Sequence, residues 1–166
     1  MKRYTTYYQT PAGLLQLQCS DEYIYEVGFV ESRTTDDQQH TLLQQCCTQL
    51  HEYFSGERTE FSLPVKQTGT AFQQKVWDLL LNISFGKTMS YHQLAVQYGD
   101  VKAIRAVAAA NGKNRLAIII PCHRVIGSHG TLTGYAGGLQ RKKWLLDHEA
   151  AWYSGVQQLP FSYFSM

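Results

Sequence analysis

The sequence has no long hydrophobic run and little cysteine. Its longest apolar runs span only a few residues, such as AIII, whereas a transmembrane helix needs roughly 20. The first ten residues lack the apolar core of a signal peptide. Four cysteines in 166 residues, with no Cys-x-x-Cys pair, do not indicate a disulfide framework. We therefore expect no membrane association and a cytoplasmic location in which thiols stay reduced.

The composition is that of a globular protein, and the charged residues are unevenly distributed along the chain. Hydrophobic residues make up 44% and charged residues 17% of the chain, which suits one domain or two small ones. Up to Pro64 there are four basic and nine acidic residues, and from Val65 onward eleven basic and four acidic. A basic second part favours contact with a polyanion. Ordinary surface charge explains the counts equally well, so charge alone does not decide between the two.

The first part, residues 1–64, is predicted to be a small α+β domain. Three short segments rich in apolar and aromatic residues predict strands, with turn residues between the first two. Apolar residues at helical spacing predict a helix over Thr41–Phe54. No chemical motif is present in this part. The predicted strands are Thr5–Tyr8, Leu14–Cys19 and Ile24–Phe29.

Residues 65–69 are predicted to be a linker, and residues 70–166 a second, mostly helical domain. Two capping boxes, TAFQ and SYHQ, each open a helix. Two short helices separated only by Gly-Asp resemble a helix-turn-helix. The predicted elements are helices from Thr70 towards Gly86, from Ser90 to Gly99, from Val101 to about Ala110 and from Leu139 to about Glu149, and a buried strand at Ile118–Ile120; the aromatic stretch Trp152–Met166 has no predicted role.

The helix predicted from Val101 carries little side-chain bulk. It includes Ala103, Ala106 and Ala108, and Arg105 is the only charge in its middle. Alanine favours helix formation and close packing in any protein. A lean helix also suits a close approach to DNA, with Arg105 reaching into the base stack. In the helix-turn-helix setting the two interpretations are evenly balanced.

Cys122 stands in IIIPCHRV, where an apolar run meets a thiol, an imidazole and a guanidinium. A nearby base or cation favours the nucleophilic thiolate. Neighbouring side chains on a strand point to opposite faces. Either the chain turns at Cys122, or a water bridges its sulfur and the imidazole of His123; we expect a bridge. The imidazole also needs an orienting acceptor, for which Asp147 and Glu149 are both candidates.

The other cysteines carry no motif. Cys19, Cys46 and Cys47 fall on predicted apolar faces, and we expect them to be packing residues. A zinc site that combines them with His40 or His51 is disfavoured because the spacings match no common pattern. We therefore expect neither a metal nor another cofactor.

The motifs SYHQLA, KAIRAVAAANGKN, IIIPCHRV, GYAGGL and WLLDHE occur together in this order. In this combination the chain from about Phe72 to Glu149 resembles the O6-alkylguanine-DNA alkyltransferases, the methylated-DNA–protein-cysteine methyltransferases. The resemblance covers nearly half of the chain. It implies an RNase H-like α+β domain followed by a winged helix-turn-helix domain. The family's N-terminal domain varies in sequence, so residues 1–64 are merely compatible with it.

The resemblance also implies roles for individual residues in the chemistry. It implies that Cys122 accepts the alkyl group and that His123 acts through a water. Glu149 rather than Asp147 then orients the histidine, and Asn114 organises the turn next to the reactive segment.

Further implied roles concern the DNA and the base pocket. Family members often carry serine at the position of Ala136; its backbone donor survives that change, but a hydroxyl contact does not. Asn111 stands where some relatives have an apolar residue, which leaves the local DNA contact open. The implied roles are Arg105 filling the space of the extruded base, Tyr91 crowding the adjacent phosphate and approaching guanine N3, Tyr135 walling the pocket, the Cys122 and Val125 carbonyls accepting from the guanine amino group, and the Ala136 amide donating to O6.

The expected function is irreversible transfer of an alkyl group from O6-alkylguanine in double-stranded DNA to Cys122 of a monomeric protein, one lesion per molecule. O4-alkylthymine as a second substrate is left open. Two alternatives bind DNA without this reaction: a lesion recogniser, whose relatives replace the reactive cysteine, and a sequence-specific transcription factor. A cysteine peptidase is the least favoured, since no oxyanion loop for peptides is evident.

Overall fold

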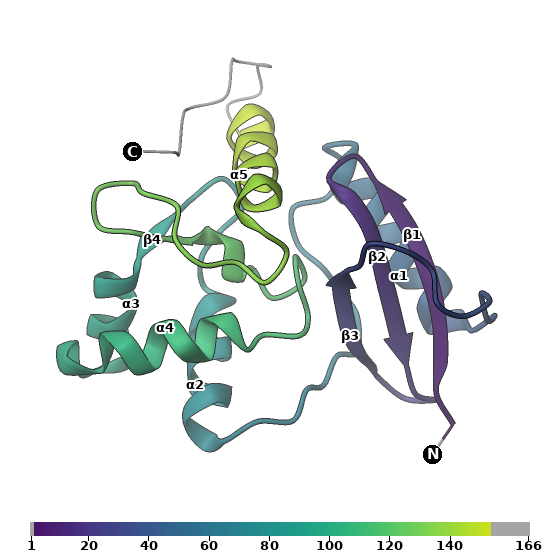
Figure 1. Ribbon diagram of the computed structural model, residues 1–166, viewed down its shortest axis with the longest axis horizontal. Helices are drawn as coiled ribbons and strands as arrows, with labels where there is room; N and C mark the ends of the chain where they lie inside the picture. Colours follow the sequence, from purple (N-terminus) through teal and green to yellow (C-terminus); the bar gives the residue numbers. More distant parts are fainter. Residues whose placement is uncertain (1, 154–166) are drawn as a thin grey trace. The chain divides into compact units, whose positions relative to one another are not determined.

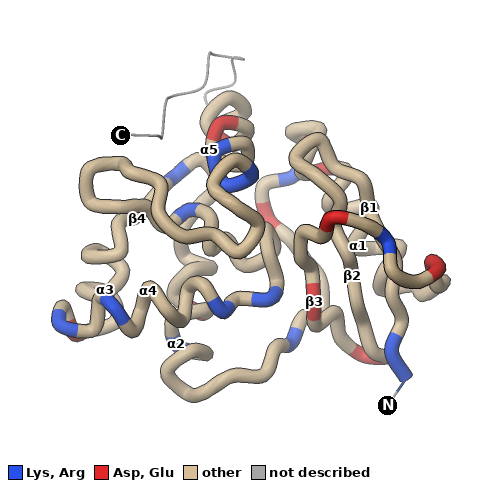
Figure 2. Tube along the Cα trace, in the orientation of Figure 1, with Lys and Arg blue, Asp and Glu red and all other residues tan. Residues whose placement is uncertain are grey.

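The computed structural model describes residues 2–153, so most of the aromatic stretch from Trp152 to Met166 lies outside the described residues. The described chain divides into two compact units (Figure 1). The first contains residues 2–68 together with Arg115–Ile119. The second contains Gly69–Asn114 and residues 120–153. Most acidic residues belong to the first unit and most basic residues to the second (Figure 2).

The first unit is a three-stranded antiparallel sheet with one helix. The strands pair in the order β1 (Tyr4–Thr10), β2 (Gly13–Cys19) and β3 (Ile24–Phe29), and helix α1 (Thr41–Phe54) packs against β1 and β2 (Figure 1). The three predicted strands and the predicted helix are confirmed. Alternate residues of β2 and one stripe of α1 form the core, as the two periodicities require. The buried residues are Leu15, Leu17 and Cys19 from β2 and Leu43, Cys46, Leu50 and Tyr53 from α1.

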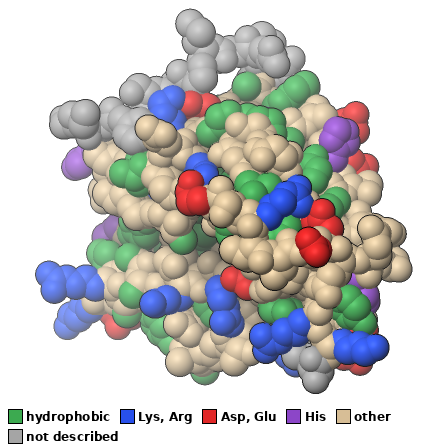
Figure 3. All heavy atoms as spheres, turned by 45° about the vertical axis from the view of Figure 1, so that its right-hand side comes forward, with side chains coloured by type: hydrophobic (Ala, Val, Ile, Leu, Met, Phe, Trp, Pro, Cys, Tyr) green, Lys and Arg blue, Asp and Glu red, His purple; other side chains and the backbone are tan. Residues whose placement is uncertain are grey.

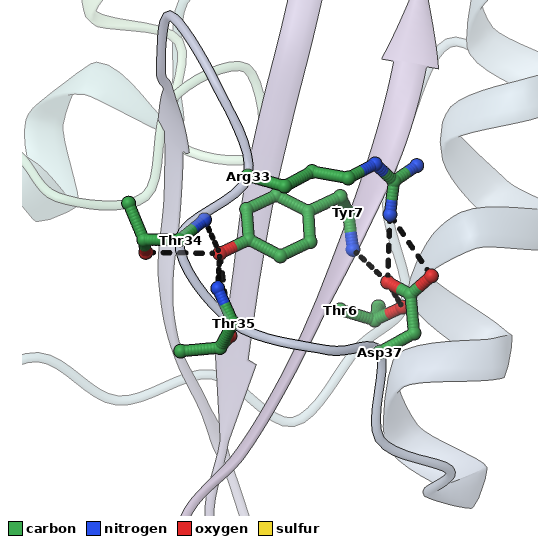
Figure 4. Close-up of polar contacts among 6 residues, drawn as sticks. All are labelled: Thr6, Tyr7, Arg33, Thr34, Thr35 and Asp37. Carbon is green, nitrogen blue, oxygen red and sulfur yellow. Dashed lines mark hydrogen bonds and ion pairs between the residues drawn. The ribbon is translucent and has the colours of Figure 1, made fainter.

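A loop after β3 folds back onto β1 through polar contacts (Figure 4). The Tyr7 hydroxyl accepts from the amides of Thr34 and Thr35 at 3.1 and 3.3 Å. Hydrogen bonds from these two residues lower the pKa of Tyr7 to about 8. The Tyr7 amide donates to Asp37, which also forms an ion pair with Arg33 at 2.9 Å. Hydrogen bonds to strand β1 thus hold this loop against the sheet.

Two segments outside the named strands, one before and one after the first helices of the second unit, each form a single bridge with strand β3 of this sheet. Val65, expected in a linker, forms an isolated parallel bridge with Ile24. Leu116 forms a second isolated bridge with Val27. The predicted strand at Ile118–Ile120 is wrong: these residues are buried, but they form turns, and Ile118 has a φ of 71°. An apolar run predicts burial, and periodicity alone cannot identify a strand in so short a run.

The second unit is built from short helices whose ends the sequence marks clearly. Helix α2 (Ala71–Leu80) and helix α3 (Tyr91–Tyr98) both begin with complete capping boxes, as predicted. Gly99 ends α3 at a φ of 108°, a left-handed conformation that suits glycine. The next turn, η1 (Val101–Ala103), is a 3₁₀ turn that leads directly into α4 (Ile104–Gly112). The predicted helix-turn-helix is therefore confirmed, with its second helix opening in 3₁₀ form.

The rest of the second unit contains the segment around Cys122 and the closing helix. Strand β4 (Met89–Ser90) pairs in parallel with β5 (Val125–Ile126), directly after the 3₁₀ turn η2 (Cys122–Arg124). Helix α5 (Leu139–Tyr153) packs against η2. No helix within residues 2–153 is both long and apolar enough to span a bilayer. On the face drawn in Figure 3, hydrophobic side chains lie among polar and charged ones.

Candidate active site

Cys122 lies at the start of a tight turn. Pro121 precedes the 3₁₀ turn η2, in which the Val125 amide donates to the Cys122 carbonyl. The Cys122 amide donates to Ile120 at 2.8 Å. Only 6% of Cys122 is exposed. The chain does turn at Cys122, but His123 Nδ1 has no hydrogen-bond partner within residues 2–153, so the expected water bridge to the sulfur stays a prediction.

His123 forms a buried charge cluster with Glu149 of α5 and with its own neighbour Arg124. His123 Nε2 lies 2.6 Å from Glu149 Oε2, and Arg124 donates to both oxygens of Glu149 at 2.8 and 3.1 Å. Arg124 also donates to the carbonyl of Ile83 at 2.6 Å, and the Gly86 amide lies 3.3 Å from Glu149 Oε1. His123 is 0% and Glu149 1% exposed. The turn η2 and the segment after α2 therefore fix a carboxylate that α5 carries.

The charges of this cluster are set by a competition between burial and pairing. Burial alone would raise the pKa of Glu149, but the charges and hydrogen bonds of His123 and Arg124 outweigh it and hold that pKa well below its usual range. Burial lowers the pKa of His123, against the opposing influence of Glu149. At neutral pH the cluster accordingly contains an ionised carboxylate and a neutral imidazole, which is the form that acts as a base.

The structure distinguishes the two acceptors proposed for the imidazole. Glu149 contacts His123, whereas Asp147 pairs with Lys143 one turn earlier in α5. Burial raises the pKa of Asp147, and the Lys143 partner opposes this shift. The sequence alone left both acidic residues open because each follows Cys122 at a useful distance. The helical rotation of α5 decides between them.

The thiol is protonated at rest. Burial raises the pKa of Cys122, and the opposing influences of Asn114 and of the positive charge on Lys142 do not cancel it. The expectation that the surroundings ionise the sulfur is therefore wrong for the resting state, because desolvation outweighs the nearby cation. His123 Nδ1, the nitrogen that does not face Glu149, is buried and has no hydrogen-bond partner within residues 2–153. The residue that follows this thiol in the chain thus carries a base with an unpartnered nitrogen.

Two asparagines support the reactive turn from the end of α4 and just beyond it. Asn114 Nδ2 donates to the Ile120 carbonyl at 2.9 Å. Asn111 Nδ2 donates to the Cys122 carbonyl at 3.3 Å. Both side chains are buried. Asn111, for which the sequence left a DNA contact open, is thus directed at the reactive turn.

Tyr91 and Lys142 meet at the loop before α5. Tyr91 donates to the Thr133 carbonyl at 3.0 Å, and Lys142 Nζ donates to the carbonyls of Thr133 and Gly134 at 3.0 and 3.2 Å. Lys142 is 0% exposed, and its ammonium lies 5.7 Å from the centre of the Tyr91 ring. Burial lowers the pKa of Lys142 to about 8. Sequence reasoning missed Lys142, although its position three residues before Leu145 places it on the buried side of the helix.

The other residues predicted for the pocket and the DNA occupy different environments. The Tyr135 hydroxyl is buried without a hydrogen-bond partner within residues 2–153, and burial and the neighbouring Cys122 raise its pKa well above 10. Val125 is buried and Ala136 is exposed. On α4 and the preceding turn, the predicted DNA-contacting residues all keep some exposure; Arg105 and Ala106 are exposed, and Ala103 and Ala108 are partly exposed.

No cluster of three His, Cys, Asp or Glu side chains suited to a metal occurs within residues 2–153. Cys19 and Cys46 are buried in the core of the first unit, and Cys47 is partly exposed. Burial raises the pKa of all three thiols. These environments are those of packing residues.

Known proteins resemble the chain over both units. Residues 71–151 match the family described as 6-O-methylguanine DNA methyltransferase, DNA binding domain, and residues 3–67 match its ribonuclease-like domain. A methylated-DNA–protein-cysteine methyltransferase of Mycobacterium bovis is 55% identical over 101 residues, a match that spans 61% of each chain. The constitutive enzyme of that name from Bacillus subtilis is 41% identical over 163 residues, which cover 92% of this chain and 98% of that one.

Solved structures agree with the sequence matches. The crystal structure of the Mycobacterium tuberculosis O6-methylguanine methyltransferase superposes with a TM-score of 0.82 at 39% identity, covering 90% of this chain and 94% of that one. The Mycobacterium tuberculosis OGT in complex with DNA superposes with a TM-score of 0.81 at 43% identity, covering 90% and 93%. The fold is thus a ribonuclease-like α+β domain followed by a helix-turn-helix DNA-binding domain, as expected. By the length and identity of these matches, the chain belongs to the methylated-DNA–protein-cysteine methyltransferase family.

Proposed function

We propose that this protein repairs DNA by transferring the alkyl group of O6-alkylguanine in duplex DNA to the sulfur of Cys122. The observation that carries the proposal is the buried Cys122 turn, in which neutral His123 is held by ionised Glu149. The names of the relatives and the DNA complex of a structural neighbour support the same reaction and the same partner. A cytoplasmic location, a monomeric state and activity without a cofactor stay predictions.

The reaction begins with removal of the thiol proton. The Cys122 thiol passes its proton to Nδ1 of His123 through one water, and Glu149 stabilises the imidazolium that forms. The sulfur then attacks the alkyl carbon from the side opposite O6. The S–C bond forms as the C–O6 bond breaks, and the electron pair of that bond stays on the guanine oxygen. The guanine anion takes a proton from Tyr91 at N3, the imidazolium proton restores Tyr91, and exchange with solvent moves the ring proton to N1, so the products are unmodified guanine and a thioether.

The leaving oxygen is stabilised by the loop before α5. The Ala136 amide donates to O6 while negative charge develops there, which is the role of an oxyanion donor. Tyr135 forms a wall of the pocket, and the carbonyl of Val125 accepts from the base. Because a thioether has no easy route back to a thiol, one molecule repairs one lesion.

The base reaches the sulfur only if it leaves the double helix. Extrusion of a base costs a few kcal/mol, and least for a damaged or weakly paired one. The helix-turn-helix would place α4 against the DNA, where Ala103, Ala106 and Ala108 allow close approach. Arg105, exposed and without a hydrogen-bond or ion-pair partner within residues 2–153, is available to fill the space of the extruded base. Tyr91 would crowd the adjacent phosphate.

The proposal is tested by weighing the protein after incubation with duplex DNA that contains O6-methylguanine. We expect a gain of one methyl group on the wild type and on Cys47→Ala, a matched control in the first unit. Cys122→Ala should gain nothing. Methylation of Cys122→Ala, or an unmodified wild type after complete binding of the lesion, would contradict the proposal; the second outcome would indicate a lesion recogniser.

A further inference from the structure

Asn111 presents a buried acceptor that the protein does not use. Its side chain is 4% exposed, and its Nδ2 donates to the Cys122 carbonyl. This donation fixes the orientation of the amide, because only the nitrogen end can donate. The other end, Oδ1, has no hydrogen-bond partner within residues 2–153. A buried acceptor without a partner costs free energy comparable to a lost hydrogen bond.

Unpartnered polar atoms gather at this site. Five buried side-chain atoms lack a hydrogen-bond partner within residues 2–153, and three of them belong to Asn111, His123 and Tyr135. Burial raises the pKa of Tyr91, and a hydrogen bond from Asn111 is among the opposing influences. The Asn111 amide therefore lies against both the Cys122 carbonyl and the Tyr91 phenol. Native proteins satisfy most buried polar atoms, so such a cluster indicates a ligand with several polar groups.

The Cys122 carbonyl is already occupied. It accepts from the Val125 amide and from Asn111 Nδ2, and a carbonyl oxygen has two lone pairs. The family resemblance implied that this carbonyl accepts from the guanine amino group. In this chain the amino group meets a carbonyl whose two acceptor positions are both filled.

We propose that Asn111 is a specificity-determining residue whose Oδ1 accepts a hydrogen bond from the 2-amino group of the extruded guanine while its Nδ2 holds the Cys122 carbonyl. This inference rests on the proposed alkyl transfer. A buried acceptor matched to an amino group discriminates strongly against an analogue that lacks this group, because the acceptor is then left unpaired. The wild type should therefore react faster with O6-methylguanine than with O6-methylhypoxanthine, which differs only in lacking the 2-amino group.

The experiment measures single-turnover methyl transfer from two duplexes that are identical except for the modified base. Asn111→Leu has a similar shape but neither donor nor acceptor. We expect its rate on O6-methylguanine to fall about tenfold more than its rate on O6-methylhypoxanthine, which should fall as well because the variant also lacks the donor to Cys122. Asn111→Asp keeps an acceptor and loses the donor to Cys122. It should react more slowly with both duplexes while still preferring the base with the amino group.

The readout is the ratio of the two rates on one protein sample, which does not depend on the fraction of folded protein. Asn111→Ala provides the same test should Asn111→Leu not fold. Equal losses on the two duplexes would overturn the proposal and leave Asn111 a purely structural residue. A wild type that does not distinguish the duplexes would overturn it as well. Absence of transfer from both duplexes to Cys122 would instead refute the proposed function.

Discussion

The two units place their ion pairs in opposite environments, one at the surface and one buried. In the first unit the ion pair of Arg33 and Asp37 lies at the surface, with side chains 49% and 46% exposed. In the second unit the Arg124–Glu149 pair is 7% and 1% exposed. Surface ion pairs contribute little to stability, whereas ions taken out of water must be fully paired. The second unit holds its charges in an environment that costs stability, which supports the role proposed for them in alkyl transfer.

The largest expected effect comes from breaking the buried cluster at Glu149. Glu149→Gln should lower the reactivity of Cys122 towards iodoacetamide at neutral pH about 100-fold, since the imidazolium loses its counter-charge. It should also destabilise the second unit by about 3 kcal/mol, because Arg124 keeps a buried, uncompensated charge. All three tryptophans lie in the second unit, so their fluorescence follows its unfolding in urea. An unchanged thiol titration would contradict the relay.

The same variant tests the pH dependence of stability. Because the pKa of Glu149 is lower in the folded than in the unfolded state, ionised Glu149 stabilises the fold above its unfolded pKa of about 4.3. This contribution is lost progressively as the pH falls below that value towards the folded pKa. The wild type should therefore lose stability on acidification more steeply than Glu149→Gln, as measured by urea midpoints between about pH 5 and pH 3. Parallel curves would show that another group dominates.

The next effect separates DNA handling from chemistry. Arg105→Ala should slow repair of duplex DNA by about 100-fold, since nothing fills the space of the extruded base. Its reaction with the free base O6-benzylguanine should change by less than about threefold, because no base needs to leave a stack. Lys102→Ala, in the preceding turn, is the matched loss of charge. Equal losses of Arg105→Ala on both substrates would remove the proposed role.

A smaller effect is expected from Lys142, the buried cation that opposes the raised pKa of the Cys122 thiol. Lys142→Met should lower the rate of iodoacetamide modification of Cys122 about tenfold at pH 7, or about 1.4 kcal/mol. The difference should shrink above pH 8, since the Lys142 pKa is lowered to about 8 and its charge disappears. Lys143→Met, which removes the neighbouring and more exposed cation, is the control. A pH-independent difference would point to packing instead of charge.

The smallest effect is expected in the first unit. Asp37→Asn removes the surface ion pair with Arg33. It should lower stability by less than about 1 kcal/mol and leave alkyl transfer unchanged, because exposed charges are screened by solvent. Circular dichroism follows the whole chain and tryptophan fluorescence the second unit alone. A loss of alkyl transfer in this variant would show that the surface ion pair of the first unit also serves the reaction.

Local signals in the sequence predicted most of the elements. The capping boxes at Thr70 and Ser90 depend only on residues three positions apart, and the structure contains both. The helix Thr41–Phe54 follows from its spacing of apolar residues. The segment Ile118–Ile120 was predicted incorrectly because an isolated bridge at Leu116 and a positive φ at Ile118 depend on pairing with a distant strand. Such pairing leaves no periodic signal in a run of three residues.

For the site, the sequence predicted Cys122 as the nucleophile, but it left the acceptor of the imidazole undecided until the family resemblance favoured Glu149. It overlooked Lys142, whose importance depends on burial, and it predicted an ionised thiol where burial keeps the proton on sulfur. Residue types and short spacings by themselves determined the capped helices, the strands and the presence of a nucleophile beside a base. Only the tertiary structure decided which carboxylate meets His123 and how strongly each group is desolvated, because both depend on residues far apart in the chain being brought together away from water.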